Sequence, residues 1–153
     1  MASNRHLGRI IALQTLYEVE LRSSAGDASL LLDEVYARNL ERYEKTVKDT
    51  AFVKRLIEGT YEQRKALDEM IQPIAPEWPL AQISRIDLAI LRLALYELTY
   101  MNDVVPPKVA INEAVELGKA FGSDNSSRFI NGVLGTAYRT LIKDDTSHAD
   151  TQI

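Results

Sequence analysis

KVAINEAVELGKAFGSDNSSRFINGVLGTAY, residues 108–138, predicts two amphipathic helices joined by a short polar turn. Apolar residues recur every three or four positions in both halves of this stretch, which is the spacing of one buried helix face. Those of the first half are Ile111, Ala114, Val115 and Gly118, and those of the second half are Ile130, Val133, Leu134, Ala137 and Leu141.

The turn between these helices carries residues that end one helix and begin another. Phe121-Gly122 closes the first helix, and we expect Gly122 to adopt the left-handed conformation that helix ends often require. Ser123, Asp124 and Asn125 follow, and their side-chain oxygens can accept hydrogen bonds from the free amides of the next helix. The two helices therefore meet at a polar turn, and we call residues 121–129, which contain it, the elbow.

Phe129 lies away from the centre of the buried stripe of the second helix. At about 100° per residue, it shares an arc of that helix with Asn125, Arg128, Gly132 and Thr136. A flat ring beside a cation and an amide suits a nucleobase, so the elbow is our candidate binding site. Periodicity alone leaves open the alternative that Phe129 packs at the rim of the core.

The rest of the sequence also predicts helices. Their expected extents are from Ser3 to about Ser23, through Leu32 and Tyr36, from about Thr46 to Ile71 with a bend or break at Gly59, and from Ser84 to Met101. Because no segment alternates with period two, we predict an all-α fold of about seven helices. Residues 1–143 are expected to form a single domain, and residues 144–153 a disordered tail.

Two residues of the central region raise questions of packing. Trp78, the only tryptophan, lies in a proline-marked connector, and we expect it to fill a gap in the core rather than to serve as a ligand platform. Glu97 falls on the apolar arc of the helix that begins near Ser84. A buried carboxylate needs a partner, which we expect among the backbone amides of another helix start, near Pro107.

Composition narrows the possible functions. A chain of 153 residues with 46% hydrophobic content can bury a core, and it contains no cysteine for disulfides, thiolate metal sites or nucleophilic catalysis. The two histidines, His6 and His148, lie far apart in the sequence, so we expect neither a metal nor a cofactor. With no signal peptide and no apolar stretch long enough to span a bilayer, we expect a cytoplasmic protein without membrane contact.

The net charge of −4 is unevenly distributed. Residues 1–17 carry Arg5 and Arg9 and no acid, and residues 105–143, which include Lys119 and Arg128, hold more basic than acidic residues. Steering of a charged ligand responds to the local field more than to the total charge, so these two regions can attract RNA. Charge counts alone leave ordinary surface scatter as the alternative.

Four sequence blocks form a recognisable set: ALQTLYEVE at 12–20, IDLAILRLALYEL at 86–98, PPKVAINEAVELGKAFG at 106–122 and SSRFINGVL at 126–134. Together they resemble the NusB transcription antitermination factors, from about Arg5 to Tyr138. The resemblance implies the NusB fold, two small helical bundles packed together. It also implies a function, since members pair with the ribosomal protein NusE, bind the boxA element in nascent RNA of ribosomal RNA operons, and help RNA polymerase read through terminators.

The resemblance also implies the residues of the interface. Together with the elbow, it yields an expected RNA-binding set of Arg5, His6, Arg9, Lys119, Phe121, Asn125, Ser126, Arg128 and Phe129. Arg5 and Arg9 are one helical turn apart, so both can project from one side and meet successive phosphates. Phe121 and Phe129 match aromatic positions where a base can stack, with core packing the alternative for Phe121. Tyr17 and Asp87 match positions that face NusE, although Asp87 also suits the first turn of its helix.

The sequence leaves two functions open besides antitermination. The chain could be a protein-interaction or homodimeric helical module that does not bind RNA directly. It could also be the NusB-like domain of a ribosomal RNA cytosine methyltransferase, but no phosphate-binding glycine motif surrounds Gly118-Lys119 and no catalytic cysteine exists. We therefore predict that the protein is not an enzyme and acts by binding alone.

Overall fold

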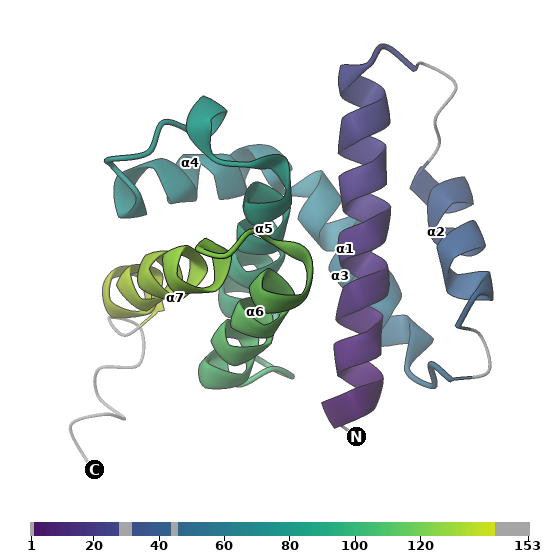
Figure 1. Ribbon diagram of the computed structural model, residues 1–153. Coiled ribbons are helices and arrows are strands. Elements are labelled where there is room, and N and C mark those ends of the chain that lie inside the picture. Colours follow the sequence, from purple (N-terminus) through teal and green to yellow (C-terminus); the bar gives the residue numbers. More distant parts are fainter. Residues whose placement is uncertain (1, 28–31, 44–45, 143–153) are drawn as a thin grey trace. The chain divides into compact units, whose positions relative to one another are not determined.

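The computed structural model describes residues 2–27, 32–43 and 46–142. These residues form seven α-helices and no strand, with a 3-10 turn at Leu80–Gln82 and a π-helical turn at Tyr138–Ile142 (Figure 1). The all-α prediction is confirmed. The chain divides into two compact units, Met1–Glu62 and Gln63–Ile153, and a single domain over residues 1–143 stays a prediction. The expected tail, residues 144–153, lies outside the described residues.

The first unit consists of α1 (Ala2–Ser24), α2 (Leu32–Glu41) and α3 (Thr50–Glu62), with α2 and α3 both packed along α1 (Figure 1). Its core includes the buried side chains of Ile11, Leu13, Val35, Val53, Leu56 and Ile57. At Gly8, α1 approaches α3 closely, because a Cβ atom there would lie 2.7 Å from Cγ2 of Val53. Gly8 thus serves helix packing in the first unit.

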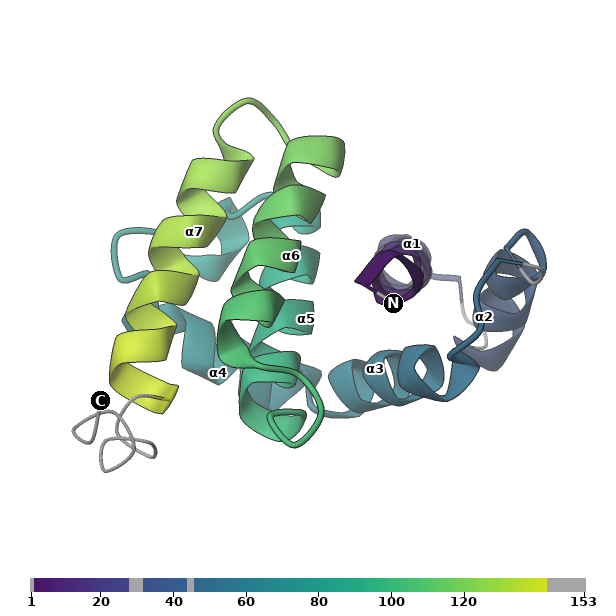
Figure 2. The same ribbon diagram turned by 90° about the horizontal axis from the view of Figure 1, so that it is seen from below.

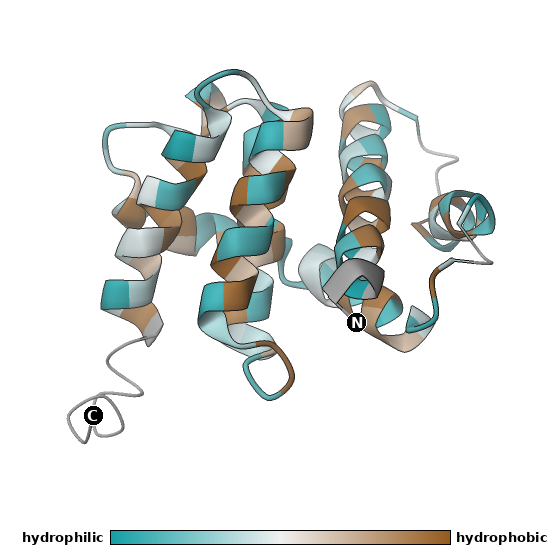
Figure 3. Ribbon diagram, turned by 60° about the horizontal axis from the view of Figure 1, so that its bottom comes forward, coloured by the Kyte–Doolittle hydropathy of each residue, from teal (hydrophilic) through white to brown (hydrophobic). Residues whose placement is uncertain are grey.

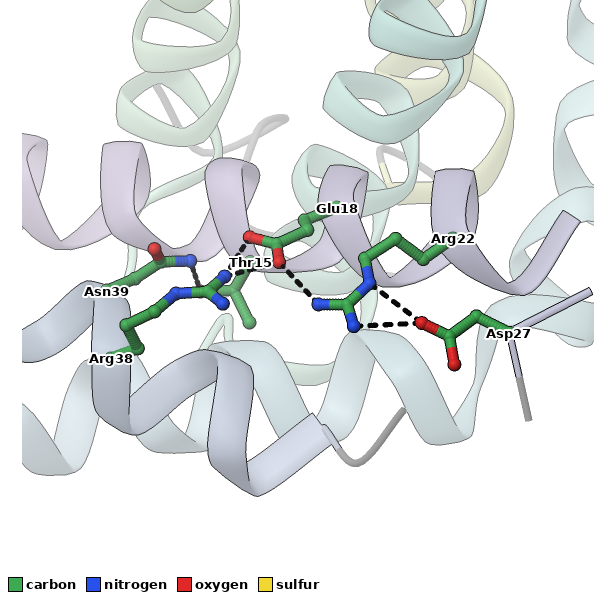
Figure 4. Close-up of polar contacts among 6 residues, drawn as sticks. All are labelled: Thr15, Glu18, Arg22, Asp27, Arg38 and Asn39. Atoms are coloured by element: carbon green, nitrogen blue, oxygen red, sulfur yellow. Dashed lines mark hydrogen bonds and ion pairs between the residues drawn. The ribbon is translucent and has the colours of Figure 1, made fainter. Parts of the chain in front are cut away.

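A line of polar contacts joins α1 to α2 and to the residues after α1 (Figure 4). The buried Asn39 amide donates a hydrogen bond to Thr15 Oγ1 at 3.1 Å. Glu18 pairs with Arg38 of α2 and accepts a hydrogen bond from Arg22 at 3.0 Å. The hydrogen bond from Arg38 is the main reason that the pKa of Glu18 lies below its ordinary value, with Arg22 adding to the effect against the opposing cost of burial.

The second unit consists of α4 (Arg64–Ile74), α5 (Arg85–Tyr100), α6 (Pro107–Phe121) and α7 (Ser126–Ala137). Its α6 and α7 lie side by side against α5, which is buried over most of its length (Figure 2). Hydrophilic and hydrophobic residues alternate in bands along the helices, as expected of helices that each bury one face (Figure 3). Glu97 is buried on α5 and has an electrostatic or hydrogen-bonding partner, and the location of that partner near Pro107 stays a prediction.

The predicted long helix over residues 46–71 is two helices in the structure. The break falls at Gln63, not at Gly59, and the second helix continues through Pro73 to Ile74. Gly59 stays helical because the buried Ile57 and Thr60 on either side hold that turn of α3 in place. The expectation of a break at Gly59 was wrong for this reason, since tertiary packing outweighs the small intrinsic cost of a helical glycine.

A bidentate ion pair connects α5 to α4. Arg92 Nε and Nη2 donate to the two carboxylate oxygens of Asp68 at 2.6 and 2.8 Å. Such a paired geometry fixes orientation as well as distance. The middle of α5 is therefore held against the middle of α4.

Candidate nucleic-acid interface

The elbow between α6 and α7 forms where the sequence predicted it, but by a different local geometry. Gly122 ends α6 in an extended conformation (φ −92°, ψ −170°), so the expected left-handed backbone is wrong. Glycine is needed for space instead, because a Cβ atom there would overlap the Ser126 side chain and lie 2.8 Å from the Gly118 carbonyl oxygen. Asn125 occupies the N-cap position of α7 without a side-chain capping bond. The expected side-chain capping by Asn125 is therefore also wrong.

Ser126 stabilises the turn between α6 and α7. Its side chain is buried, and its Oγ accepts a hydrogen bond from the backbone N–H of Ser123 at 2.9 Å. A buried hydroxyl with this partner holds the turn and is poorly placed to contact a base or a sugar. The structure thus favours a positioning role for Ser126, and its RNA contact stays a prediction. Asn125, by contrast, is exposed.

Three aromatic side chains come together at the elbow. Phe121 at the end of α6 is 40% exposed, so its packing inside the core is excluded, and Phe129 of α7 is half-buried. Trp78 from the connector after α4 meets Phe129 edge to face, with ring centroids 5.8 Å apart and an interplanar angle of 74°. Trp78 is 47% exposed, so the expectation that it fills a gap in the core was wrong.

These rings border an open pocket of about 610 Å³. Its walls include the side chains of Trp78, Ile83, Asp87, Phe121, Arg128 and Phe129, and Asn125 also lines it. Its volume falls within the roughly 300–1,000 Å³ of typical small-ligand sites. The pocket combines flat apolar surfaces with one cation and one carboxylate.

The cations expected at the elbow are at the surface. Lys119 and Arg128 are both exposed, and Lys119 Nζ lies 3.4 Å from Glu116 Oε1 in an exposed ion pair. An exposed pair of this kind is weak and can give way to a phosphate. Arg128 belongs to the pocket wall, so the structure places a cation beside the exposed rings.

The expected basic residues of α1 differ in exposure. The Arg5 and Arg9 guanidinium carbons lie 4.7 and 5.1 Å from the centre of the Phe52 ring, so both side chains leave α1 on the same side. Arg5 is half-buried and lies 3.9 Å from Asp49, whereas Arg9 is 1% exposed. We expected the side chains of both Arg5 and Arg9 to be accessible to RNA, and only that of Arg5 is partly exposed. His6 is half-buried, and a common surface of these residues with the elbow stays a prediction.

The two residues expected to face NusE lie in different units. Tyr17 is half-buried on α1. Asp87 stands in the first turn of α5, where its backbone N–H donates to Ser84 Oγ at 3.2 Å. The residue is 9% exposed, and its buried Oδ1 has no hydrogen-bond partner among the described residues. Ser84 thus caps α5, Asp87 stands in the first turn where the helix dipole favours a carboxylate, and the NusE contact of Asp87 stays a prediction.

Comparison with known proteins gives the family. The family model described as NusB family matches residues 6–139. The chain belongs to the NusB family. It is 47% identical over 137 residues to "Transcription antitermination protein NusB" of Chloroflexus aggregans, covering 89% of this chain and 87% of that protein. The NusB protein of Roseiflexus castenholzii is 46% identical, covering 89% and 92% of the two chains. The solved structure of T. maritima NusB superposes with a TM-score of 0.79 at 28% identity, covering 94% of this chain and 96% of that chain.

These NusB relatives bear on one of the expectations. They are transcription antitermination proteins, and the family is not one of enzymes, which confirms the prediction of a non-enzymatic factor. Among the described helices of this NusB-family chain, none is long and apolar enough to cross a membrane.

Two features of the pocket escaped the sequence analysis. The exposure of Trp78 and the unpartnered oxygen of Asp87 both depend on packing between the connector, α5 and α7. The position of Trp78 among prolines is a sequence signal for this exposure, because a rigid connector can hold a large ring at the surface. No sequence signal indicates that Oδ1 of Asp87 would have no hydrogen-bond partner among the described residues.

Proposed function

We propose that this chain binds boxA-type single-stranded RNA of ribosomal RNA operons together with NusE. The bound pair then helps RNA polymerase, within an antitermination complex, to read through terminators. Membership of the NusB family supports this function. The structural observation that carries it is the cluster at the elbow of the exposed Phe121 ring, the half-buried Phe129 ring and the exposed Arg128 cation.

The mechanism is binding without chemistry. Bases stack on Phe121 and Phe129, which offer flat apolar faces to any base. Phosphates approach Lys119, Arg128 and the half-buried Arg5, whose cations release counterions from the RNA. Asn125 is exposed beside the rings and can donate to or accept from a base edge. NusE extends the surface through contacts with Tyr17 and Asp87, and the complex works in the cytoplasm.

The test measures RNA binding to the purified chain, with and without NusE, at several salt concentrations. We expect NusE to tighten binding and the logarithm of the affinity to fall with the logarithm of salt, by about 0.7 for each phosphate contact. A flat salt response would contradict the proposed surface. Light scattering on the same samples tests the alternative of a homodimer, which predicts dimers that bind no RNA with or without NusE.

A further inference from the structure

One exposed face of α7 continues from the elbow to the far end of the helix, at the edge of the second unit (Figure 2). Gly132 lies at its centre and is exposed. At about 3.6 residues per turn, Arg128, Thr136 and Arg139 all lie within about 40° of that position around the helix axis. We call these four residues the α7 track. It begins at Arg128 on the pocket wall and ends about 16 Å further along, at Arg139 in the turn that follows α7.

The side chain of Arg139 is held over this face. Its Nη2 donates a hydrogen bond to Thr136 Oγ1 at 3.2 Å, and that hydroxyl donates to the Gly132 carbonyl oxygen at 3.2 Å. Its Nη1 lies 3.5 Å from the place that a Cβ atom on Gly135 would take, so the guanidinium folds back along the helix towards Arg128. Because the Thr136 hydroxyl is neutral, this hydrogen bond orients the exposed guanidinium without neutralising its charge.

The charge and the shape of the track suit a polyanionic strand. Residues 125–142 contain Arg128 and Arg139 and no aspartate or glutamate. No atom of the described chain uses the space above Gly132, although an exposed helical glycine costs about 1 kcal/mol relative to alanine. Glycine permits the close approach of another backbone. A strand that carries one phosphate per nucleotide can therefore lie against the helix and meet both arginines.

We propose that the bound RNA strand leaves the elbow along the α7 track, passing close over Gly132 and placing a phosphate on Arg139. The proposal rests on the RNA-binding function proposed above. It adds Arg139 as a phosphate contact and Thr136 as the residue that positions it. RNA is the occupant, and not an acidic protein segment, because the track is continuous with the rings of Phe121 and Phe129, whose flat faces suit bases.

The experiment uses a labelled boxA-type RNA from a ribosomal RNA operon leader, extended by UUUUUU at each end so that the strand can cover the track in either direction. Fluorescence anisotropy gives the affinity at several salt concentrations, for the chain alone and for the chain with NusE. Binding of NusE without RNA is measured separately.

Arg139→Gln removes the cation at the end of the track. We expect RNA affinity to fall about two- to fivefold, the range of an exposed ion pair. The slope of log affinity against log salt should become shallower by about 0.7, the share of one phosphate of a single strand. Lys108→Gln removes an exposed cation at the start of α6, outside the track, and should change neither quantity. Thr136→Val removes the hydroxyl that holds Arg139 and should reproduce part of both changes.

Gly132→Leu tests the close approach of the strand. It should weaken RNA binding several-fold without destabilising the protein, because leucine favours a helix more than glycine does and its Cβ atom meets nothing within 4 Å. Asn131→Leu places the same side chain at the neighbouring exposed position, about 100° away around the helix, and should keep the affinity. Urea unfolding followed by circular dichroism establishes that each variant is folded and gives its stability.

The outcomes separate this proposal from the proposed function. Unchanged affinity and slope in folded Arg139→Gln, or unchanged affinity in folded Gly132→Leu, overturns the path along α7 and leaves RNA binding standing. If Arg139→Gln instead weakens the binding of NusE without RNA, a protein segment occupies the track and the proposal is also overturned. Failure of the unchanged protein to bind the RNA, with and without NusE, overturns the RNA-binding function and this proposal with it.

Discussion

The side chain of Ser126 occupies the space that a side chain on Gly122 would need. A Cβ atom at position 122 would overlap the Ser126 side chain and approach the Gly118 carbonyl oxygen to 2.8 Å. Ser126 in turn accepts a hydrogen bond from the Ser123 N–H, which closes the turn. This pair of residues makes the elbow short enough to bring Phe121, at the end of α6, and Phe129, in α7, onto the wall of one pocket.

Gly122→Ala should therefore destabilise the protein by about 1–3 kcal/mol, the usual cost of forcing extra volume into a packed site. Urea unfolding followed by circular dichroism measures the change. Gly132→Ala is the matched control, because a Cβ atom there meets nothing within 4 Å on the exposed side of α7. That variant should be more stable by up to about 1 kcal/mol. Equal stabilities for the two variants would contradict the steric role of Gly122.

Phe129→Ala should weaken RNA binding while the protein stays folded. Loss of one base-stacking platform is expected to cost about 1–3 kcal/mol of binding free energy, measured by anisotropy with a boxA-type RNA and NusE. Val109→Ala removes an exposed apolar side chain near the other end of α6 and should leave affinity unchanged. Unchanged affinity in folded Phe129→Ala would show that the ring stacks on no base and would favour the alternative that Phe129 packs at the rim of the core.

Arg128→Gln should lower RNA affinity and also flatten its dependence on salt. If Arg128 meets one phosphate, the slope of log affinity against log salt should become shallower by about 0.7. Lys108→Gln removes an exposed cation at the start of α6, away from the pocket, and should leave the slope as it was. A slope that is the same in Arg128→Gln and in the unchanged protein would show that Arg128 meets no phosphate.

Glu18→Gln should reduce stability at neutral pH, and the reduction should disappear in acid. The pKa of Glu18 lies below its ordinary value of 4.5 in the folded protein, chiefly through the hydrogen bond from Arg38. A carboxyl with a depressed folded pKa contributes stability that is full above 4.5 and lost as pH falls through the folded pKa. Unfolding free energies of both proteins between pH 7 and pH 3 check this.

The control for Glu18→Gln is Glu116→Gln, which breaks a more exposed ion pair with Lys119. Exposed pairs of this kind contribute little, so this variant should follow the unchanged protein at every pH. A gap between the Glu18→Gln and unchanged proteins that does not narrow as the pH falls below 4.5 would point to lost packing instead of lost charge.

The sequence by itself determined the presence of α5, α6 and α7 and the family. The start of α5 and both ends of α6 follow from local signals: Ser84 caps α5, Pro107 opens α6, and Phe121-Gly122 closes it. Capping and apolar periodicity act within a few residues, so they can be deduced without knowing the fold. The four sequence blocks were enough to identify the NusB family, which the comparisons confirmed.

Tertiary structure alone decided which of the candidate residues face a ligand. Arg9 and Ser126 carry polar groups suited to RNA, yet the structure buries both, while Trp78, expected in the core, stands half exposed beside Phe129. Exposure depends on which other elements cover a side chain, and those elements come from distant parts of the chain. A local pattern can place a residue on a face of its helix, but only the packing of the neighbouring helices settles whether that face meets water, protein or RNA.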